Sequence, residues 1–377
     1  MSQKERILLI PHAPATAIRT RTGELALALS SLGQAVDLFR RSAQDPGLSK
    51  GQKLRWHFKE ACLPWFRYET VNEFLRNIYV PTLHFHTGMA GYWDEVVSFI
   101  LMKMPYRLIF SAAYDGLPAR KNLSQRKFIY DYVDDHASGW IAEGKLDVAA
   151  RVESYVKRQM ATADQVVASS LVLMNLAKNK YQRNAMVIPN GARVKSTRQQ
   201  VFADGFVRTD AEPIFVGYIG GLDSFVRIDL VVKAIASIRN RGVDMRMSIV
   251  GWGPALDAVD RYDWLDLKGF RQPDEIPQLM REFSIGVVPF TLSSFTHAAL
   301  PLKVIEYGAA QLMTISSPLE ELKLRQFPWV HFADLTVDSW IDALTFMMEK
   351  KWSQEWDGIV DRFEWIESAK QLLEAME

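Results

Sequence analysis

The sequence predicts an α/β protein made of two Rossmann-like domains that face each other across a cleft. Its 377 residues are enough for two domains, at roughly 100–200 residues per domain. Short apolar runs alternate with helical repeats along most of the chain, which is typical of βαβ units and mainly parallel sheets. The stretch 192–212 is polar and has little pattern, so we expect it to link a domain at 1–200 to a domain at 205–350.

The overall composition excludes several classes of protein. Lys plus Arg number 45 and Asp plus Glu 44, so no general basic field is available to hold a nucleic acid. The single cysteine, Cys62, excludes an internal disulfide framework and a Cys-rich zinc site. The four apolar residues "ILLI" are too few for a signal peptide, and no run of about 18 apolar residues follows. We therefore expect a cytoplasmic protein, with peripheral contact at the inner face of the membrane left open.

The first half of the chain predicts strands joined by helices. The helical repeats lie at 23–33, 91–104 and about 147–162. The strand-like runs are 6–10, 35–39, 82–86, 106–115, 164–170 and 184–191.

The second half alternates more regularly and predicts about six strands between 213 and 334. These runs are 213–219, 245–251, 265–270, 284–290, 312–317 and 329–334. Ligands of open α/β sheets bind beyond the carboxyl ends of the strands, so the loops that directly follow these runs are the candidate binding loops.

One helix, at 300–310 ("LPLKVIEYGAA"), has the properties of an anion site. Leu300 is a poor N-cap before Pro301, so the first N–H groups and the helix dipole are open to an anion. Lys303 is unfavourable at this end of a helix unless an anion neutralises it. Glu306, one turn further, could accept hydrogen bonds from ribose hydroxyls, which together describes a nucleotide. The alternative is an ordinary helix with a Lys–Glu surface pair.

Glycines follow two of the predicted strands. Gly220 and Gly221 would allow the backbone to approach a phosphate closely, and Gly251 stands in a similar strand–turn context. Each is equally compatible with a plain tight turn. Arg227 could reach the same phosphate or could simply lie in the exposed first turn of the next helix.

The ordered series "VGYIGGL", "SIVGWGP", "LKGF…DEIPQLM", "SIGVVPF" and "LPLKVIEYGAA" resembles the donor-binding domain of GT-B glycosyltransferases, close to family 4. "ADQVVASS" and "VIPNG" resemble the end of that group's N-terminal domain. The segment 351–377 resembles the helix that crosses back onto the N-terminal domain in this fold. The resemblance implies an acceptor-binding first domain and a nucleotide-sugar-binding second domain.

By this resemblance, Glu306 would hold the ribose, and Lys303 would hold the diphosphate with Pro301 and Leu302 at the helix start. Phe270 and Arg271 would frame the base. Many family 4 enzymes carry a second glutamate at the position of Ala298, so the sugar and the stereochemical outcome stay open.

The function implied is a hexosyltransferase that needs no metal or other cofactor. It would take a UDP-sugar, or else a GDP-sugar, and transfer the sugar to a hydroxyl of a glycan or lipid-linked acceptor. Two alternatives are a non-catalytic nucleotide-sugar-binding or partner protein and a sugar-nucleotide epimerase.

The acceptor would meet the loops of the first domain. Asp115 ends a predicted strand, where a general base could take a proton from a hydroxyl. Asp134 and Asp135 are rivals for that role or for acceptor binding. His86 ends another strand, as a catalytic or a structural histidine. The last candidates, Arg19 and Arg21, would bind a sugar acid or a lipid-linked phosphate, or would be solvated in a loop.

The segment 50–79 has a distinct composition. It holds six Lys or Arg against three Glu, interleaved with aromatic residues. Such a segment can rest on an anionic membrane, or it can form a pair of amphipathic helices packed on its own domain.

Overall fold

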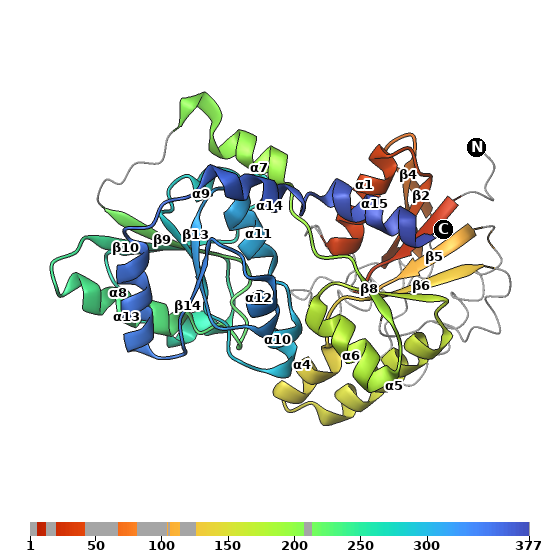
Figure 1. The fold of residues 1–377 in the computed structure, drawn as a ribbon, viewed down its shortest axis with the longest axis horizontal. Coiled ribbons are helices and arrows are strands. Elements are labelled where there is room, and N and C mark those ends of the chain that lie inside the picture. The colour runs from red at the N-terminus through yellow and green to blue at the C-terminus, as the bar shows by residue number, and fades with distance from the viewer. Residues whose placement is uncertain are drawn as a thin grey trace, which may run out of the picture. The chain divides into compact units, whose positions relative to one another are not determined.

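The computed structural model describes residues 6–12, 20–41, 67–80, 104, 106–113, 126–206 and 213–376. The chain forms two compact units, and each has a sheet of its own (Figure 1). The first unit comprises Met1–Ile188 with Trp365–Glu377, and the second comprises Pro189–Glu364. The predicted α/β class with two parallel-sheet domains is confirmed.

The first unit contains an eight-stranded sheet in the order β3-β4-β2-β1-β5-β6-β7-β8. All of its pairings are parallel except the antiparallel pair β3–β4. The strands are β1 (Arg6–Ile10), β2 (Val36–Arg41), β3 (Arg67–Thr70), β4 (Leu75–Val80), β5 (Tyr106–Ser111), β6 (Lys127–Tyr132), β7 (Gln165–Ala168) and β8 (Ala185–Val187). Its described helices are α1 (Arg21–Ser31), α4 (His136–Ala142), α5 (Leu146–Thr162), α6 (Leu171–Tyr181) and α15 (Trp365–Met376).

The last helix returns to the first unit, as the sequence predicted. Helix α15 packs against α1, and Figure 1 shows the two side by side. Lys127 adds a tie, because its Nζ donates to the carbonyl of Met376 at 2.6 Å. The returning part begins at Trp365, and the preceding residues of the predicted 351–377 segment belong to the second unit.

The segment 67–80 corrects the helical interpretation of 50–79. Residues 67–70 and 75–80 form the edge strands β3 and β4 of the sheet. Arg76 is not a membrane-facing charge, because its guanidinium bonds both carboxylate oxygens of the buried Asp37 at 2.8 and 2.7 Å. Residues 50–66 lie outside the described residues, as do the predicted strand 82–86 and the main part of the predicted helix 91–104.

The second unit contains a six-stranded, all-parallel sheet in the order β11-β10-β9-β12-β13-β14, which confirms the predicted strands. They are β9 (Ile214–Ile219), β10 (Met245–Val250), β11 (Leu265–Gly269), β12 (Ile285–Val288), β13 (Met313–Ser316) and β14 (Val330–Phe332). The helices are α7 (Val194–Val201), α8 (Ile228–Arg239), α9 (Ile276–Met280), α10 (Ser294–Ala298), α11 (Leu302–Ala309), α12 (Glu320–Arg325), α13 (Val337–Met347) and α14 (Asp357–Asp361). Short 3-10 turns lie at Ala203–Gly205, Pro254–Ala258 and Gln354–Trp356.

The predicted linker is largely ordered structure. Residues 194–201 form α7, which packs against α11 and α14 of the second unit. Arg198 strengthens this contact, because its Nη1 lies 3.0 Å from a carboxylate oxygen of Asp361. The boundary therefore falls at 188/189 instead of near 200, and 207–212 lie outside the described residues.

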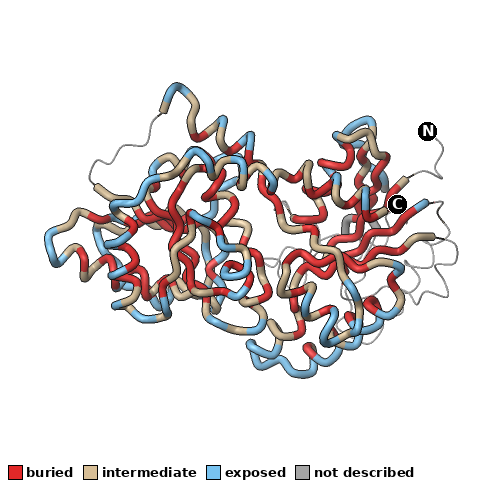
Figure 2. Tube along the Cα trace, viewed as in Figure 1, coloured by how far each residue is buried: buried red, intermediate tan, exposed pale blue. Residues whose placement is uncertain are grey.

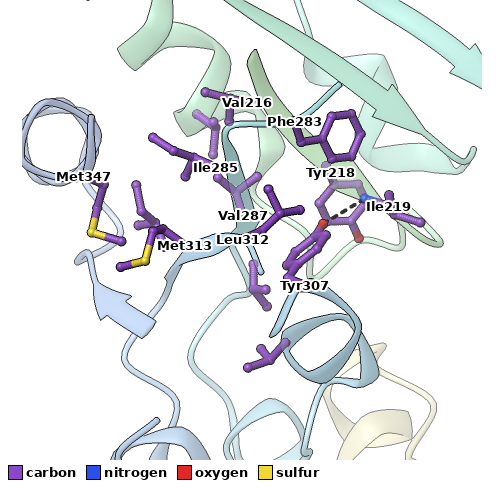
Figure 3. Packing of buried hydrophobic residues seen from close by; sticks show 14 of the residues in the cluster. Val216, Tyr218, Ile219, Phe283, Ile285, Val287, Tyr307, Leu312, Met313 and Met347 are labelled. Atoms are coloured by element: carbon purple, nitrogen blue, oxygen red, sulfur yellow. Dashed lines mark hydrogen bonds between the residues drawn. The ribbon is translucent and has the colours of Figure 1, made fainter. Parts of the chain in front are cut away.

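Helix α11 is fixed on the sheet of the second unit by buried contacts. The backbone N–H of Ile219 donates to the Tyr307 hydroxyl at 3.1 Å, a bond drawn in Figure 3. Tyr307 also lies over Gly286, where a Cβ would stand only 2.5 Å from its ring. On the other side, Trp329 Nε1 donates to the carbonyl of Val304 at 3.2 Å. Figure 2 shows the strands of both sheets as mostly buried, so α11 rests on a packed core.

Gly286→Ala should destabilise the second unit, because the added methyl group must displace the Tyr307 ring. Overpacking of this kind costs about 1–3 kcal/mol. Gly358→Ala is the matched control. A Cβ at Gly358 meets nothing within 4 Å, and the change should stabilise α14 by about 0.4–1 kcal/mol. Urea unfolding followed by tryptophan fluorescence measures both, and equal midpoints for the two variants would contradict this packing.

Candidate functional site

The sheet of the second unit has one topological switch point, between β9 and β12. The chain runs from β9 outward through β10 and β11, then crosses to the other side at β12. Ligands of such sheets bind in the crevice beyond the strand ends at this point. The two loops that form it are tied together. The N–H of Arg227 donates to the carbonyl of Pro289 at 2.6 Å, and the N–H of Thr291 donates to the carbonyl of Phe225 at 2.7 Å.

Helix α11 begins without a side-chain cap. Pro301 is its N-cap, one position earlier than the first-turn place predicted, and Leu302 is the first helical residue. The neighbouring helix α10 differs, because Ser293 and Thr296 form a complete capping box at its start. Open first-turn N–H groups and the helix dipole favour an anion. The uncapped start predicted from the sequence is therefore present.

Lys303 holds its amine over the carboxyl end of β9. Its Nζ donates to the Tyr218 hydroxyl at 3.0 Å and lies 4.3 Å from the centroid of the Tyr218 ring. The Phe290 ring lies on another side, at 4.7 Å. A Cβ on Gly220 would stand 3.1 Å from this Nζ, so the glycine leaves the amine open toward the loop. An exposed Lys–Glu surface pair does not describe this geometry.

Tyr218 completes the arrangement, although no motif in the sequence pointed to it. Its hydroxyl donates to the carbonyl of Gly221 at 2.6 Å. The hydroxyl proton is thereby used, and the oxygen lone pairs face the Lys303 amine. The orientation of the lysine is thus set by the loop that follows β9.

Burial lowers the pKa of Lys303 to about 7, while the charges of Glu306 and Asp223 oppose the shift. Near neutral pH the amine of the free protein is thus a mixture of charged and neutral forms. A bound anion would favour the charged form. Glu306 lies one turn further along α11 and is partly buried.

Two glycines of the site have different surroundings. Gly220 adopts φ +132° and lies beside Lys303. Gly251 adopts φ +141°, and a Cβ there would stand 1.9 Å from the carbonyl oxygen of Gly220. The closest approach at Gly251 is therefore backbone to backbone between two loops, whereas the sequence suggested approach to a phosphate.

Arg227 is held by its own helix. It is the N-cap of α8, and its guanidinium bonds both carboxylate oxygens of Asp229 at 2.9 and 3.0 Å. This bidentate pair lowers the pKa of Asp229. The arginine therefore orders the helix start, and a phosphate would have to compete with Asp229 for it.

Aromatic side chains stand at the ends of the neighbouring strands. Phe270 follows β11 and is 49% exposed, and Arg271 bonds the carbonyl of Phe270 at 3.2 Å. Trp252 follows β10 and is 69% exposed, although sequence reasoning did not select it. A large apolar side chain left exposed beside a candidate site is the signal that points to it.

The structure describes only some of the candidate residues in the first unit. Asp115, His86 and Arg19 lie outside the described residues. Arg21 is neither solvated nor free for an acceptor, because it is buried and bonds both carboxylate oxygens of Asp131 at 3.0 and 3.1 Å. It also donates to the carbonyl of Ile188 at 2.8 Å. Arg21 and Asp131 thus form a structural ion pair that joins α1 to the sheet.

The two aspartates that follow β6 differ in their burial and in their hydrogen bonds. Asp135 is the buried N-cap of α4 and accepts hydrogen bonds from the N–H and hydroxyl of Ser138. Asp134 is only partly buried, and its burial raises the pKa of the carboxyl group to about 7. Asp131 and Asp135 add to this rise, while Arg21 opposes it.

Comparison with known proteins gives a family match in the second unit. Residues 213–346, which carry the switch-point site, match the model of the family described as glycosyl transferases group 1. A curated relative, the putative teichuronic acid biosynthesis glycosyltransferase TuaH of Bacillus subtilis (strain 168), is 25% identical over 232 residues. That alignment covers 58% of this chain and 57% of the relative, so it spans little more than half of that protein.

Several solved structures share the whole fold. Sucrose-phosphate synthase from Thermosynechococcus elongatus has a TM-score of 0.75 at 16% identity, covering 99% of this chain and 98% of that one. HepE of Anabaena, solved in complex with UDP and glucose, has a TM-score of 0.64 at 13% identity, covering 99% of each chain. The chain therefore has the fold of the GT-B glycosyltransferases.

No helix among the described residues is both long enough and apolar enough to cross a membrane.

Lys303→Met should stabilise the free protein at pH 6. The unfolded chain binds this proton with a pKa of 10.5 and the folded chain with a pKa of about 7. The charged amine therefore lowers stability in full below about pH 7, and this cost disappears as the pH rises toward 10.5. Thermal unfolding at pH 6 and pH 9.5 should show a larger gain at pH 6. Lys323→Met, at an exposed lysine of α12, is the control and should show no such trend.

Proposed function

We propose that this protein is a glycosyltransferase that moves a hexosyl group from a nucleotide-diphosphate sugar to a hydroxyl acceptor. The observation that carries the proposal is the Lys303 amine, held over Gly220 beside the uncapped start of α11. This combination offers a positive charge and open N–H groups at one switch point, which suits a diphosphate. The family match over 213–346 supports the same assignment.

The donor would lie across the strand ends of the second unit. Its diphosphate would meet Pro301, Leu302 and Lys303, and its ribose would meet Glu306 one turn deeper. The base would lie outward along the sheet, toward Phe270 and Arg271. UDP is the proposed nucleotide because HepE was solved with UDP, and GDP is the alternative.

Catalysis would be largely electrostatic at the donor. As the bond from the anomeric carbon to the diphosphate breaks, negative charge grows on the leaving group. The N–H groups of α11 and the charged form of Lys303 would stabilise it. We propose that these groups suffice without a metal ion, so that UDP affinity persists in the presence of a chelator.

The acceptor is proposed to be a hydroxyl of a glycan or lipid-linked intermediate. The relative named for teichuronic acid biosynthesis supports a role in polysaccharide assembly. Asp115, at the end of the predicted strand 106–115, remains the general base proposed from the sequence. Contact of the basic residues Lys50, Lys53, Arg55 and Lys59 with anionic membranes remains part of the proposal, and co-sedimentation with anionic vesicles at low salt tests it.

Glu306→Gln should weaken UDP and uridine alike, because the ribose is common to both. A hydrogen bond to a charged group contributes roughly 1.5–3 kcal/mol, which corresponds to about 10- to 150-fold in affinity. Lys303→Met should weaken UDP strongly and uridine hardly at all. Calorimetric titration of both variants, with Lys323→Met as control, separates the two positions. If both variants bind UDP like the unaltered protein, the donor site lies elsewhere.

UDP binding should take up a proton above about pH 7. The free amine of Lys303 has a pKa near 7, and a bound diphosphate should raise that pKa. Affinity should then fall by up to about tenfold per pH unit from pH 7 upward, until the pKa of the complex is reached. Titrations at pH 8 in buffers of different ionisation enthalpy measure the uptake. An uptake that persists unchanged in Lys303→Met would show that another group titrates.

A further inference from the structure

The short segment that leads into α11 is held by contacts outside that helix. Ala299 is the C-cap of α10, and its N–H donates to the carbonyl of Thr296 at 3.3 Å. Leu300 follows and is only 2% exposed, so it lies in the core of the second unit. Pro301 is then the N-cap of α11 and supplies no side-chain hydrogen bond. The direction of the first N–H groups of α11 therefore depends on how residues 299–301 are fixed.

The carbonyl of Leu300 has a hydrogen-bond donor from a distant part of the chain. The Nδ2 of Asn190, 110 positions earlier, lies 3.3 Å from this carbonyl oxygen. No other donor to the oxygen lies among the described residues, because the first turn of α11 closes on the carbonyl of Pro301 instead. Since Leu300 is buried, its carbonyl would lose its partner without Asn190, and an unsatisfied buried carbonyl costs free energy.

Asn190 is itself anchored in the second unit. It belongs to "VIPNG", which in the sequence only resembled the end of an N-terminal domain, whereas the boundary at 188/189 places the asparagine in the second unit. Two residues further, the N–H of Ala192 donates to the carbonyl of Phe363 at 2.8 Å. Helix α7 begins shortly afterwards and packs against α11 (Figure 1). The amide of Asn190 therefore reaches Leu300 from a fixed support.

The groups that would bind a diphosphate come directly after Leu300. Leu302 is the first residue of α11, and Lys303 follows with its amine on the Tyr218 hydroxyl. Because the ring of Pro301 fixes φ at −65°, a rotation of the peptide before it would turn the first N–H groups of the helix as well. A ligand would then have to order this segment when it binds, which lowers its affinity.

We propose that Asn190 is a positioning residue of the donor site: its side-chain amide holds the carbonyl of Leu300 and so directs the first N–H groups of α11 toward a diphosphate. The proposal rests on the function proposed above and concerns contacts inside the second unit alone. Asn190 acts through the backbone and does not touch the ligand. Its effect should therefore appear with a ligand that carries a diphosphate and be absent with one that lacks it.

The test is calorimetric titration with UDP and with uridine. Asn190→Ala should weaken UDP about 2- to 10-fold, because a single hydrogen bond changes an equilibrium by about that factor. Uridine should bind as it does to the unaltered protein, which also shows that the variant folds. Asn190→Gln keeps an amide donor and should recover part of the UDP affinity. Asn240→Ala, at the exposed C-cap of α8, is the matched control and should leave both affinities unchanged.

Two results would overturn the inference while the proposed function stands. One is an Asn190→Ala variant that binds UDP as tightly as the unaltered protein does. The other is a loss of affinity by the same factor for UDP and uridine, since Asn190 would then support the fold of the second unit and not the diphosphate. Asn190→Ser gives the same comparison if the alanine variant does not fold. If the unaltered protein binds neither UDP nor GDP, the proposed function fails and this inference fails with it.

Discussion

The candidate donor site depends on one interaction, the contact of the Lys303 amine with Tyr218 at the end of β9. The amine is partly buried, bonded to a phenol oxygen and flanked by the Tyr218 and Phe290 rings. Contact with the ring faces stabilises the charged form in part, but burial still lowers the pKa to about 7. A lysine kept in this condition is costly for the fold alone. In the proposed function, it becomes favourable when an anion binds at the open N–H groups beside it.

The packing beneath α11 keeps that interaction in place. Tyr307 bonds the backbone of Ile219 at the end of β9 and lies over Gly286 in β12, so one side chain connects both strands of the switch point to the helix. Trp329 holds the same helix from its other side through the carbonyl of Val304. Because Lys303 and Glu306 lie on this short, fixed helix, their spacing and direction are set by the core. The hydrophobic core of the second unit therefore positions the side chains of the candidate site.

The fold of the second unit could be predicted because each local pattern agreed with the final structure. Its central strands are mostly buried and read as largely apolar runs, and the glycines after β9 and β10 mark the ends of those two strands. The uncapped start of α11 was also predictable, since the missing cap before Lys303 is a property of neighbouring residues. The first unit was less predictable. Strand β6 was missed, although Lys127–Tyr132 is mostly buried, because "KFIYDY" mixes charged and aromatic residues. The strands β3 and β4 were taken for helices because edge strands tolerate charge.

The remaining differences come from contacts between distant parts of the sequence. Arg21 looked like an acceptor-binding arginine because its partner Asp131 lies 110 residues away. The close approach of Gly251 to the carbonyl of Gly220 could not be predicted either, because that carbonyl belongs to another loop. Tyr218 and Trp252 carry no local motif, and only the assembled sheet places them at the strand ends. Composition and residue spacing do not predict such contacts. They do predict helix caps, periodic helices and strands, and turns.

The central claim is that the Lys303 amine is only partly protonated in the free protein near neutral pH, and that a bound nucleotide diphosphate favours its charged form. The most direct measurement is a pH titration of the Lys303 Cε signal by NMR with ¹³C-labelled lysine, assigned by comparison with Lys303→Met. The account predicts an apparent pKa near 7 in the free protein, an increase when UDP is added and no increase with uridine. A pKa near 10.5 in the free protein, or one that UDP leaves unchanged, would contradict it.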